Sequence, residues 1–270
     1  MRKAKELLKI NNINPKKKFG QNFLIDDNIL KKISSLHNNS SSIIEIGAGT
    51  GALTQYLNKD DINFYIVEFD IDMINILKKE YPNIKIYHKD ATKFDFSTIT
   101  SLESERVTVF GNLPYNVSSR IIFNLIKNIN KIDYCYFMLQ KEVALRLIEK
   151  PNSKNYSRIT VMTDLFFDKK ISFNVKPNSF YPAPRVDSSI VEFKVKKNIE
   201  NINRVLFAEI VKASFANRRK MLRNNLKRYI KYGIEEVIDL KKRAENLTFN
   251  EYVAITNIVD KKEIIDEKIS

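Results

Sequence analysis

The sequence has no tryptophan, two histidines and a single cysteine, Cys135. One cysteine excludes an intrachain disulfide and a cysteine-rich zinc site, and neither histidine has partners at metal-ligand spacing. We therefore expect no metal centre and a reducing, cytoplasmic environment. Six glycines and seven prolines exclude collagen-like and low-complexity chains. The chain also lacks an apolar run of the ~18 residues that a transmembrane helix needs, so we expect a soluble protein with no membrane partner.

The sequence also has fewer acidic than basic residues. The 270 residues include 46 Lys and Arg against 32 Asp and Glu, a formal net charge of +14. The surplus is concentrated in residues 1–18 and in residues 204–231, where nine Lys and Arg accompany one acid, Glu209. Such stretches bind nucleic acid or an anionic membrane, or they form a solvated helix face. Charge alone leaves these alternatives open.

Short apolar runs alternate with helical patterns over the first two thirds of the chain. Leu53 with Leu57, and Met73 with Leu77, have the spacing of one helix face. Strands alternating with amphipathic helices form βαβ units, so we predict a doubly wound α/β domain with a mostly parallel sheet and helices on both faces. The last two strands have no helix between them, which predicts a hairpin at one end of the sheet. The predicted strands are 42–46, 63–69, 84–87, 107–110, 134–139, 170–174 and 188–195.

The pattern changes after Val195. Strand-like runs are absent from there on, and apolar residues recur at helical spacing from Ile202. We therefore predict two domains, an α/β domain of residues 1–197 and a small all-helical domain of residues 198–270. The predicted core of the second domain contains Val205, Ile210, Val211, Phe215, Leu222 and Leu226.

A glycine-rich loop, Glu-Ile-Gly-Ala-Gly-Thr-Gly at residues 45–51, follows the first strong strand. Glycines there let the backbone turn tightly into a helix and approach a ligand closely. Glu68 ends the next strand, where a carboxylate can accept hydrogen bonds from both hydroxyls of an adenosine ribose. Asp90, after the third strand, is placed to meet an adenine amino group. Gly47, Gly49 and Ala52 also satisfy the dinucleotide-binding pattern, so a nicotinamide enzyme and a merely tight turn stay open as alternatives.

The segment Asn112-Leu113-Pro114-Tyr115 comes directly after the fourth strand, where a doubly wound sheet binds ligands. The Asn112 side-chain carbonyl and a neighbouring backbone carbonyl can each accept a hydrogen from an exocyclic amine, while Pro114 fixes the corner. Tyr115 offers a face on which a base can stack. Two such acceptors favour a pyramidal nitrogen whose lone pair points at an electrophile such as a methyl sulfonium. Proline corners are also common as purely structural turns, so this segment is informative chiefly together with the glycine loop.

These motifs resemble the KsgA-type small-subunit rRNA adenine dimethyltransferases over nearly the whole chain. Residues 18–24, 177–188, 215–226 and 243–247 are similar to the family's N-terminal signature, later loop, basic helix and closing signature. Lys89 departs from a usual glycine, Met221 from a frequent threonine and Ile255 from a usual leucine. The resemblance implies a Rossmann-like class I methyltransferase domain in residues 1–197, an RNA-binding helical domain in residues 198–270, and S-adenosylmethionine as the cofactor.

The resemblance also implies roles for individual residues. The expected cofactor contacts are Asn22, Leu24, Gly47, Gly49, Gly51, Glu68, Asp90, Ala91 and Asn112. The expected target-amine site is formed by Asn112, Leu113, Pro114 and Tyr115, with Phe180 flanking the target base. The residues expected to bind RNA are Lys16, Lys17, Lys18, Arg218, Arg219, Lys220, Arg223, Lys227 and Arg228.

The implied function is dimethylation of the N6 amino groups of two adjacent adenosines in the 3′-terminal hairpin loop of small-subunit (16S) rRNA, within the immature small ribosomal subunit. We expect the chain to act as a monomer. Three alternatives remain open at this point. They are a large-subunit rRNA adenine methyltransferase, a non-enzymatic RNA-binding assembly or transcription factor with the same fold, and a nicotinamide dehydrogenase, which leaves the corner at residues 112–115 unexplained.

Overall fold

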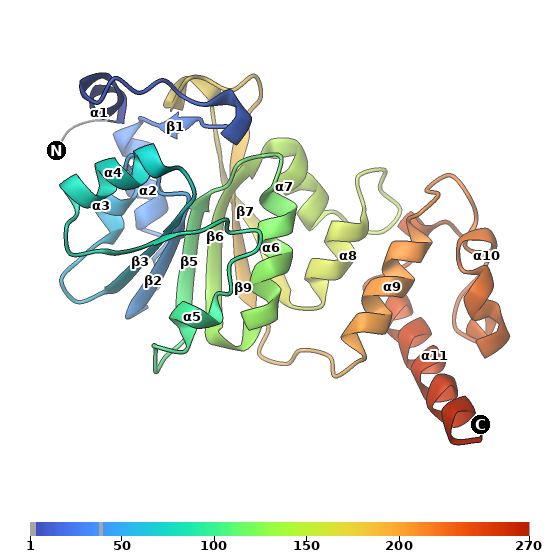
Figure 1. Ribbon diagram of the computed structural model, residues 1–270. Helices are drawn as coiled ribbons and strands as arrows, with labels where there is room; N and C mark the ends of the chain where they lie inside the picture. Colours follow the sequence, from blue (N-terminus) through green and yellow to red (C-terminus); the bar gives the residue numbers. More distant parts are fainter. Residues whose placement is uncertain (1–3, 38–39, 270) are drawn as a thin grey trace. The chain divides into compact units, whose positions relative to one another are not determined.

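The computed structural model describes residues 4–37 and 40–269, except for the side chains of Lys17 and residues 263–269. The chain forms two compact units (Figure 1). The first, here called the sheet unit, comprises Met1–Ala144 and Lys169–Val195. The second, the helical unit, comprises Leu145–Asp168 and Lys196–Ser270. The prediction placed one boundary after residue 197 and assigned Leu145–Asp168 to the α/β domain, whereas the contacts divide the chain after Val195 and group Leu145–Asp168 with the helical unit.

A seven-stranded sheet with the order β4-β3-β2-β5-β6-β9-β7 forms the centre of the sheet unit (Figure 1). The five strands from β4 to β6 pair in parallel, and β9 runs antiparallel to β6. All seven predicted strands are confirmed, with ends that differ by three residues or fewer, and β9 and β7 are neighbours at one edge, as the expected hairpin requires. The strands are β2 (Ser42–Ile46), β3 (Asn63–Glu68), β4 (Lys85–His88), β5 (Val107–Asn112), β6 (Ile132–Gln140), β7 (Phe167–Val175) and β9 (Ser188–Val195).

The strand order reverses between β2 and β5, because β3 and β4 lie on one side of β2 and β6 lies beyond β5. Right-handed crossovers therefore place the helices that follow β2 and β3 on one face and the helix that follows β5 on the other. The crevice outside such a reversal is where doubly wound sheets bind ligands. The helices of the parallel part are α3 (Thr54–Leu57), α4 (Ile71–Glu80), α5 (Ser97–Thr100), α6 (Ser118–Leu125) and the 3-10 helix η2 (Ile126–Lys131).

The N-terminal part of the chain joins the sheet unit through a second, two-stranded sheet. In it, β1 (Phe23–Leu24) runs antiparallel to β8 (Phe180–Tyr181). A helix, α2, begins after Asp26, whose carboxylate accepts hydrogen bonds from the backbone N–H groups of Asn28 and Ile29. The other elements here are α1 (Ala4–Ile10), η1 (Lys17–Phe19), α2 (Asp27–Ser34), η3 (Pro177–Ser179) and the start of α7 (Lys141–Ile148).

The helical unit is built from α8 and the elements after residue 203, among which α9 packs on α11. The expected basic helix of residues 215–226 is wrong in its first half, because α9 ends at Ser214, residues 215–220 form a turn, and only Leu222–Asn225 are helical. The Asn225 side-chain amide donates to the carbonyls of Ser214 and Asn217, which satisfies backbone acceptors at the helix end. The elements are α8 (Arg158–Asp164), α9 (Arg204–Ser214), α10 (Leu222–Asn225), η4 (Lys227–Tyr232), η5 (Ile234–Glu236), η6 (Ala244–Asn246) and α11 (Phe249–Ile269).

Most of the predicted helical core is confirmed. Ile210, Val211, Leu222 and Leu226 are fully buried, whereas Val205, in the first turn of α9, is 72% exposed and does not belong to the core. Within the described residues, no helix combines the length and the apolar character that a membrane crossing requires.

Gly51 should be the least replaceable glycine of the loop. Its φ is +80°, and an added Cβ would lie 2.5 Å from Cε2 of Tyr81, which is itself buried. We expect Gly51→Ala to lower the free energy of unfolding by ~2 kcal/mol or more, from backbone strain and overpacking together. Gly47→Ala is the matched control, since φ there is +68° but the nearest atom lies 3.8 Å away. Equal losses in urea unfolding for the two variants would contradict a clash with Tyr81.

Candidate active site

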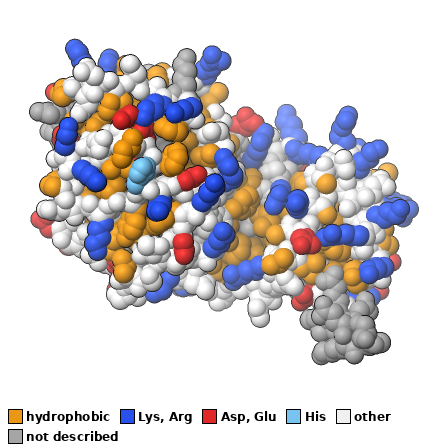
Figure 2. Space-filling view, viewed as in Figure 1, with side chains coloured by type: hydrophobic (Ala, Val, Ile, Leu, Met, Phe, Trp, Pro, Cys, Tyr) orange, Lys and Arg blue, Asp and Glu red, His pale blue; other side chains and the backbone are white. Residues whose placement is uncertain are grey.

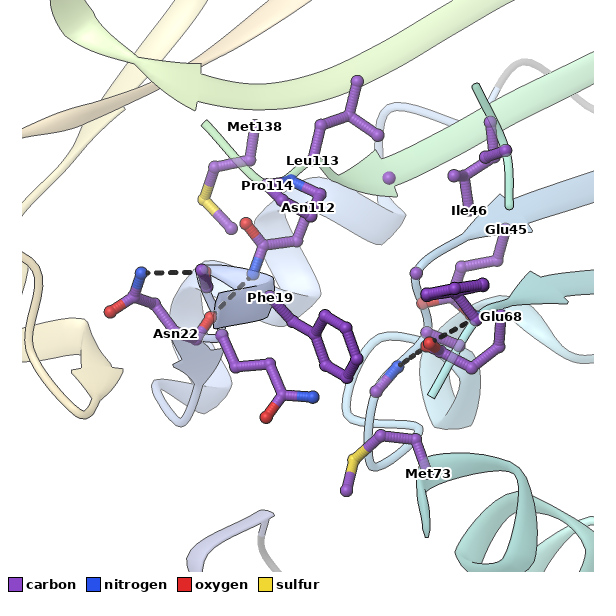
Figure 3. A pocket seen from close by; sticks show the side chains of 18 of the residues that line it. Phe19, Asn22, Glu45, Ile46, Glu68, Met73, Asn112, Leu113, Pro114 and Met138 are labelled. Atoms are coloured by element: carbon purple, nitrogen blue, oxygen red, sulfur yellow. Dashed lines mark hydrogen bonds between the residues drawn. The ribbon is translucent and has the colours of Figure 1, made fainter. Parts of the chain in front are cut away.

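A cavity of about 250 Å³ lies at the carboxyl ends of β2, β3 and β5, at the reversal of strand order (Figure 3). The register places it there, because Ile46 of β2 is paired with Gly111 of β5, so that the glycine loop and Asn112 leave the sheet side by side. The predicted residues that line the cavity are Asn22, Leu24, Gly47, Gly49, Glu68, Asp90, Ala91, Asn112, Leu113, Pro114 and Tyr115. Residues from five separate parts of the chain therefore meet at one cavity.

Backbone donors fix the carboxylate of Glu68 at the tip of β3. Its Oε2 accepts from the N–H of Gly49 at 3.0 Å, and its Oε1 accepts from the N–H groups of Phe69 at 2.7 Å and Asp70 at 2.9 Å. Burial raises the pKa of Glu68, although these backbone hydrogen bonds oppose the rise. The carboxylate is thus held in one orientation beside the glycine loop, with acceptor capacity left for hydroxyl groups.

Glu45, at the base of the same loop, is a second buried carboxyl. Burial raises its pKa from 4.5 to about 7, while a hydrogen bond from the Thr54 hydroxyl at 2.6 Å opposes the rise and the nearby Glu68 adds to it. The side chain therefore joins the loop to the start of α3 and carries a proton over much of the range below neutral pH.

The Asn112 side chain projects from the end of β5, and its amide has one defined orientation. Its Nδ2 donates to the backbone carbonyl of Asn22 at 2.9 Å, and Figure 3 shows the oxygen on the opposite side. Among the described residues, none donates a hydrogen bond to Oδ1. The N–H of Leu113 donates to the carbonyl of Met138 at 3.2 Å, which holds the corner against β6. Asn112 therefore presents a free, aimed acceptor.

Tyr115 completes the corner. Its hydroxyl shares a hydrogen bond of 2.8 Å with the Ser188 hydroxyl, and burial raises its pKa although that hydrogen bond opposes the rise. Asp90 also lines the cavity, and its Oδ1 accepts from the N–H of Thr92 at 2.8 Å. Ala91, next to it, is 8% exposed and also lines the cavity.

Two predicted site residues lie outside the lining. Gly51 packs against Tyr81, whose hydroxyl donates to the Gly51 carbonyl at 3.0 Å. Gly51 therefore stabilises the loop on the side that faces away from the cavity. Phe180 was expected to flank a base, but its side chain is 3% exposed and belongs to the hydrophobic core that contains Leu24, Met138 and Ile190. The pairing of β8 with β1, which the sequence did not reveal, buries it.

Four aromatic residues that were not predicted as site residues also line the cavity, namely Phe19, Phe23, Phe69 and Tyr136. Phe19 lies between the Asn112 and Glu68 sides of the cavity in Figure 3, and Phe69 is 53% exposed. Their rings meet edge to face with centroids 5.7 Å apart. Phe69 could have been predicted from its position directly after Glu68. It was missed because the predicted strand 63–69 included it as its last residue.

The basic residues separate into two groups. Arg218 donates to the carbonyls of Lys154 and Tyr156 and pairs with Glu245 at 2.8 Å, and Arg228 pairs with Glu209 at 2.8 Å. Lys16 forms ion pairs in the sheet unit, so these three cations serve contacts within the protein. Lys18, Arg219, Lys220, Arg223 and Lys227 are exposed and, within the described part of the chain, have no ion pair; the side chain of Lys17 lies outside the described residues.

Comparison with known proteins bears directly on this site. Residues 12–261 match the family described as Ribosomal RNA adenine dimethylase. The chain belongs to this family. A Ribosomal RNA small subunit methyltransferase A of Francisella tularensis subsp. novicida is 43% identical over 254 residues, 90% of this chain and 97% of the relative.

Solved structures agree with the family assignment. A dimethyladenosine transferase from Plasmodium falciparum is similar with a TM-score of 0.75 and 28% identity, over 89% of this chain and 98% of that one. The 23S rRNA methyltransferase ErmE shares the fold, with a TM-score of 0.65 and 20% identity over 88% of this chain and all of that one. The dimethylase is thus an enzyme with a Rossmann-like class I methyltransferase fold, and the nicotinamide dehydrogenase and the non-enzymatic factor are no longer alternatives.

The buried carboxyl of Glu45 should make the stability of the dimethylase depend on pH. Its pKa is about 7 in the folded chain against 4.5 unperturbed, so the wild type loses stability as the pH rises through this window. A Glu45→Gln variant lacks this loss, and the difference between the two pKa values corresponds to ~3 kcal/mol. The free energy of unfolding of the variant, measured in urea, should therefore rise relative to that of the wild type between pH 4.5 and pH 7. A constant difference across this range would contradict the assignment.

Proposed function

We propose that this dimethylase transfers methyl groups from S-adenosylmethionine to the N6 amino groups of two adjacent adenosines in the 3′-terminal hairpin loop of small-subunit rRNA. The observation that carries the proposal is the Asn112 amide, whose nitrogen is engaged by Asn22 and whose oxygen is free beside the cavity. A fixed acceptor at this place suits an exocyclic amine, which must be held by its hydrogens for its lone pair to reach an electrophile.

The residues of the cavity fit the proposed cofactor. Glu68 has a carboxylate fixed by three backbone donors, which suits the two hydroxyls of a ribose, and Asp90 with Ala91 lies beyond it for an adenine ring. Gly47 and Gly49 have φ of +68° and +57°, a backbone conformation that glycine adopts without strain. A Cβ on Gly47 would meet no atom closer than 3.8 Å, whereas one on Gly49 would lie 3.0 Å from the Phe23 ring. Asn22 and Leu24 also line the cavity. When bound, the sulfonium would supply an electrophilic methyl group.

The chain's own part in the reaction is orientation. Asn112 Oδ1 and the carbonyl of Leu113 would each accept one hydrogen of the target amine, and the face of Tyr115 would stack on the base. The amine becomes acidic once it is alkylated, so the site needs no strong base. The target base must leave its stack to enter, which costs a few kcal/mol and costs less in a hairpin loop than in a duplex. Stacking on Tyr115 offsets ~1–3 kcal/mol of that cost.

The exposed cations suit the phosphates of an RNA. Arg219, Lys220, Arg223 and Lys227 lie in the turn after α9 and along α10 and η4, and Lys18 lies at the mouth of the cavity. Figure 2 shows Lys and Arg spread over the visible face of the molecule with few acids among them. The small-subunit assignment is supported by the relative of 43% identity, which is named as a small-subunit methyltransferase. We further propose that the enzyme acts as a monomer in the cytoplasm.

The decisive experiment is the transfer of labelled methyl groups to immature small subunits, large subunits and naked duplex RNA, followed by mass spectrometry of the rRNA. We expect two dimethylated adenosines next to each other in small-subunit rRNA and none in the other substrates. Modification of large-subunit rRNA instead would support the second candidate function, that of a large-subunit rRNA adenine methyltransferase. This candidate is retained because the 23S rRNA methyltransferase ErmE has a similar fold.

Replacing Asn112 tests the proposed acceptor. We expect Asn112→Ala to lower the rate of transfer ~100-fold or more, because the amine loses one of its two fixed acceptors. The affinity for S-adenosylhomocysteine, measured by calorimetry, should change far less. Parallel losses in turnover and in affinity would show that Asn112 serves the cofactor alone.

Two variants distinguish the exposed basic residues from those that bond within the protein. Arg219→Gln with Lys220→Gln should lower the slope of log affinity against log salt for RNA by ~1.5, since each lost phosphate contact removes ~0.7–0.9. The thermal midpoint should not move. Arg218→Gln should instead lower the midpoint, because it leaves the carbonyls of Lys154 and Tyr156 without their donor. An unchanged salt slope in the double variant would remove these residues from the RNA-binding surface.

A further inference from the structure

We propose that residues 16–24, here called the strap, position the side-chain amide of Asn112 for transfer, and that the ion pairs of Lys16 hold the strap in place. This inference rests on the function proposed above. It assigns a positioning role to Lys16, which the sequence had marked as a phosphate ligand, and it makes the strap a shared element of the cofactor-binding and amine-binding parts of the cavity.

The strap contacts both parts of the site. On the cofactor side, the Phe19 ring of the strap meets the ring of Phe69, the residue after Glu68, edge to face. In the middle, Gly20 lies against the corner, where an added Cβ would be 3.7 Å from Cβ of Pro114. Phe19 therefore lies between the Glu68 and Asn112 sides of the cavity, as Figure 3 shows. Movement of the strap must change both sides together.

The strap also decides which way the Asn112 amide faces. The Asn22 carbonyl can only accept, so it selects the amide nitrogen at 2.9 Å, and a flipped amide would place two oxygens against each other. Oδ1 is thereby left for the amine. The side chain of Asn22 donates to the Gly20 carbonyl at 3.2 Å, which stabilises the turn that presents the Asn22 carbonyl.

A cluster at the start of the strap fixes it to the end of β3 and the start of α4. Lys16 Nζ lies 2.5 Å from Asp70 Oδ1 and 2.6 Å from Asp72 Oδ2. Gln21 reinforces the cluster, since its Nε2 donates to Asp70 Oδ2 at 2.7 Å and its Oε1 accepts from the N–H of Lys16 at 2.7 Å. Asp70 is itself the N-cap of α4, so the strap is fixed to a rigid element.

Asp70 is not an ordinary surface partner. Its side chain is 4% exposed, and although burial by itself raises its pKa, the hydrogen bonds from Lys16 and Gln21 hold the pKa below its usual value. Exposed ion pairs contribute little because solvent screens them, whereas a partly buried, hydrogen-bonded pair is screened much less. The cluster can therefore hold the strap against thermal opening.

The test compares Lys16→Met with the wild type in two measurements. The first, on the free protein, is the solvent-exchange rate of the Asn112 side-chain NH₂ by ¹⁵N NMR, with the signal assigned by its loss in Asn112→Asp. The second is the dissociation constant of S-adenosylhomocysteine. We expect exchange to become ~10-fold faster and the dissociation constant to rise ~10-fold, the size of one charge-assisted hydrogen bond. Turnover at saturating cofactor should also fall, because the amide no longer keeps one orientation.

Matched variants isolate the ion pair. Lys16→Arg should restore both values. Lys9→Met removes an exposed charge from α1 and should leave both unchanged, because within the described residues Lys9 has no ion pair. Combining Lys16→Met with Asp72→Asn should add little to Lys16→Met alone, since the two side chains act as one unit. If Lys16→Met fails to fold, Asp72→Asn takes its place in both measurements.

Two results would overturn the inference. Weaker cofactor-product binding with an unchanged Asn112 exchange rate would make the strap a cover for the cofactor alone. No change in either measurement would make the Lys16 cluster a surface ion pair without consequence. The exchange measurement needs neither cofactor nor RNA, so it gives its answer even if no rRNA proves to be a substrate.

Discussion

The site depends on how closely β2 and β5 approach each other at their carboxyl ends. Ile46 is paired with Gly111, and a Cβ on Gly111 would lie 3.0 Å from the Ile46 carbonyl and 2.7 Å from a methyl group of Leu113. The bare Gly111 backbone therefore brings Asn112 next to the glycine loop. Because side chains alternate across a strand, a shift of one residue in this pairing would turn Asn112 to the wrong face of the sheet. The tight contact makes such a shift costly.

Much of this arrangement could be predicted from the sequence, for a physical reason. Strands buried on both faces are continuous apolar runs, and the glycine loop, Glu68 and Asn112 follow such runs directly, so their place at one edge of the sheet results from the parallel topology alone. These features depend on neighbours in sequence and on general rules of chain connection, both of which a single sequence contains.

The features that were not predicted depend on partners far away in the chain. Lys16 is 54 residues from Asp70, and Arg218 is 62 residues from Tyr156, so charge counting could not tell an ion-paired cation from a free one. Phe180 is buried by a two-residue strand pairing with Leu24 that has no sequence pattern of its own. Val205 has helical spacing but lies in the exposed first turn of α9.

The segment Leu145–Asp168 leaves the sheet unit, builds part of the helical unit and returns before β7 is complete. Its Tyr156, Val161 and Leu165 are all but fully buried, and Arg218 bonds it to the turn after α9. The helical unit is therefore not a single C-terminal segment but includes an insertion from within the sheet unit's sequence. Ending the chain at residue 197 would leave the apolar segment Leu145–Asp168 without the rest of its unit, and grafting the helical unit onto another enzyme would require two separate segments of the donor sequence rather than one.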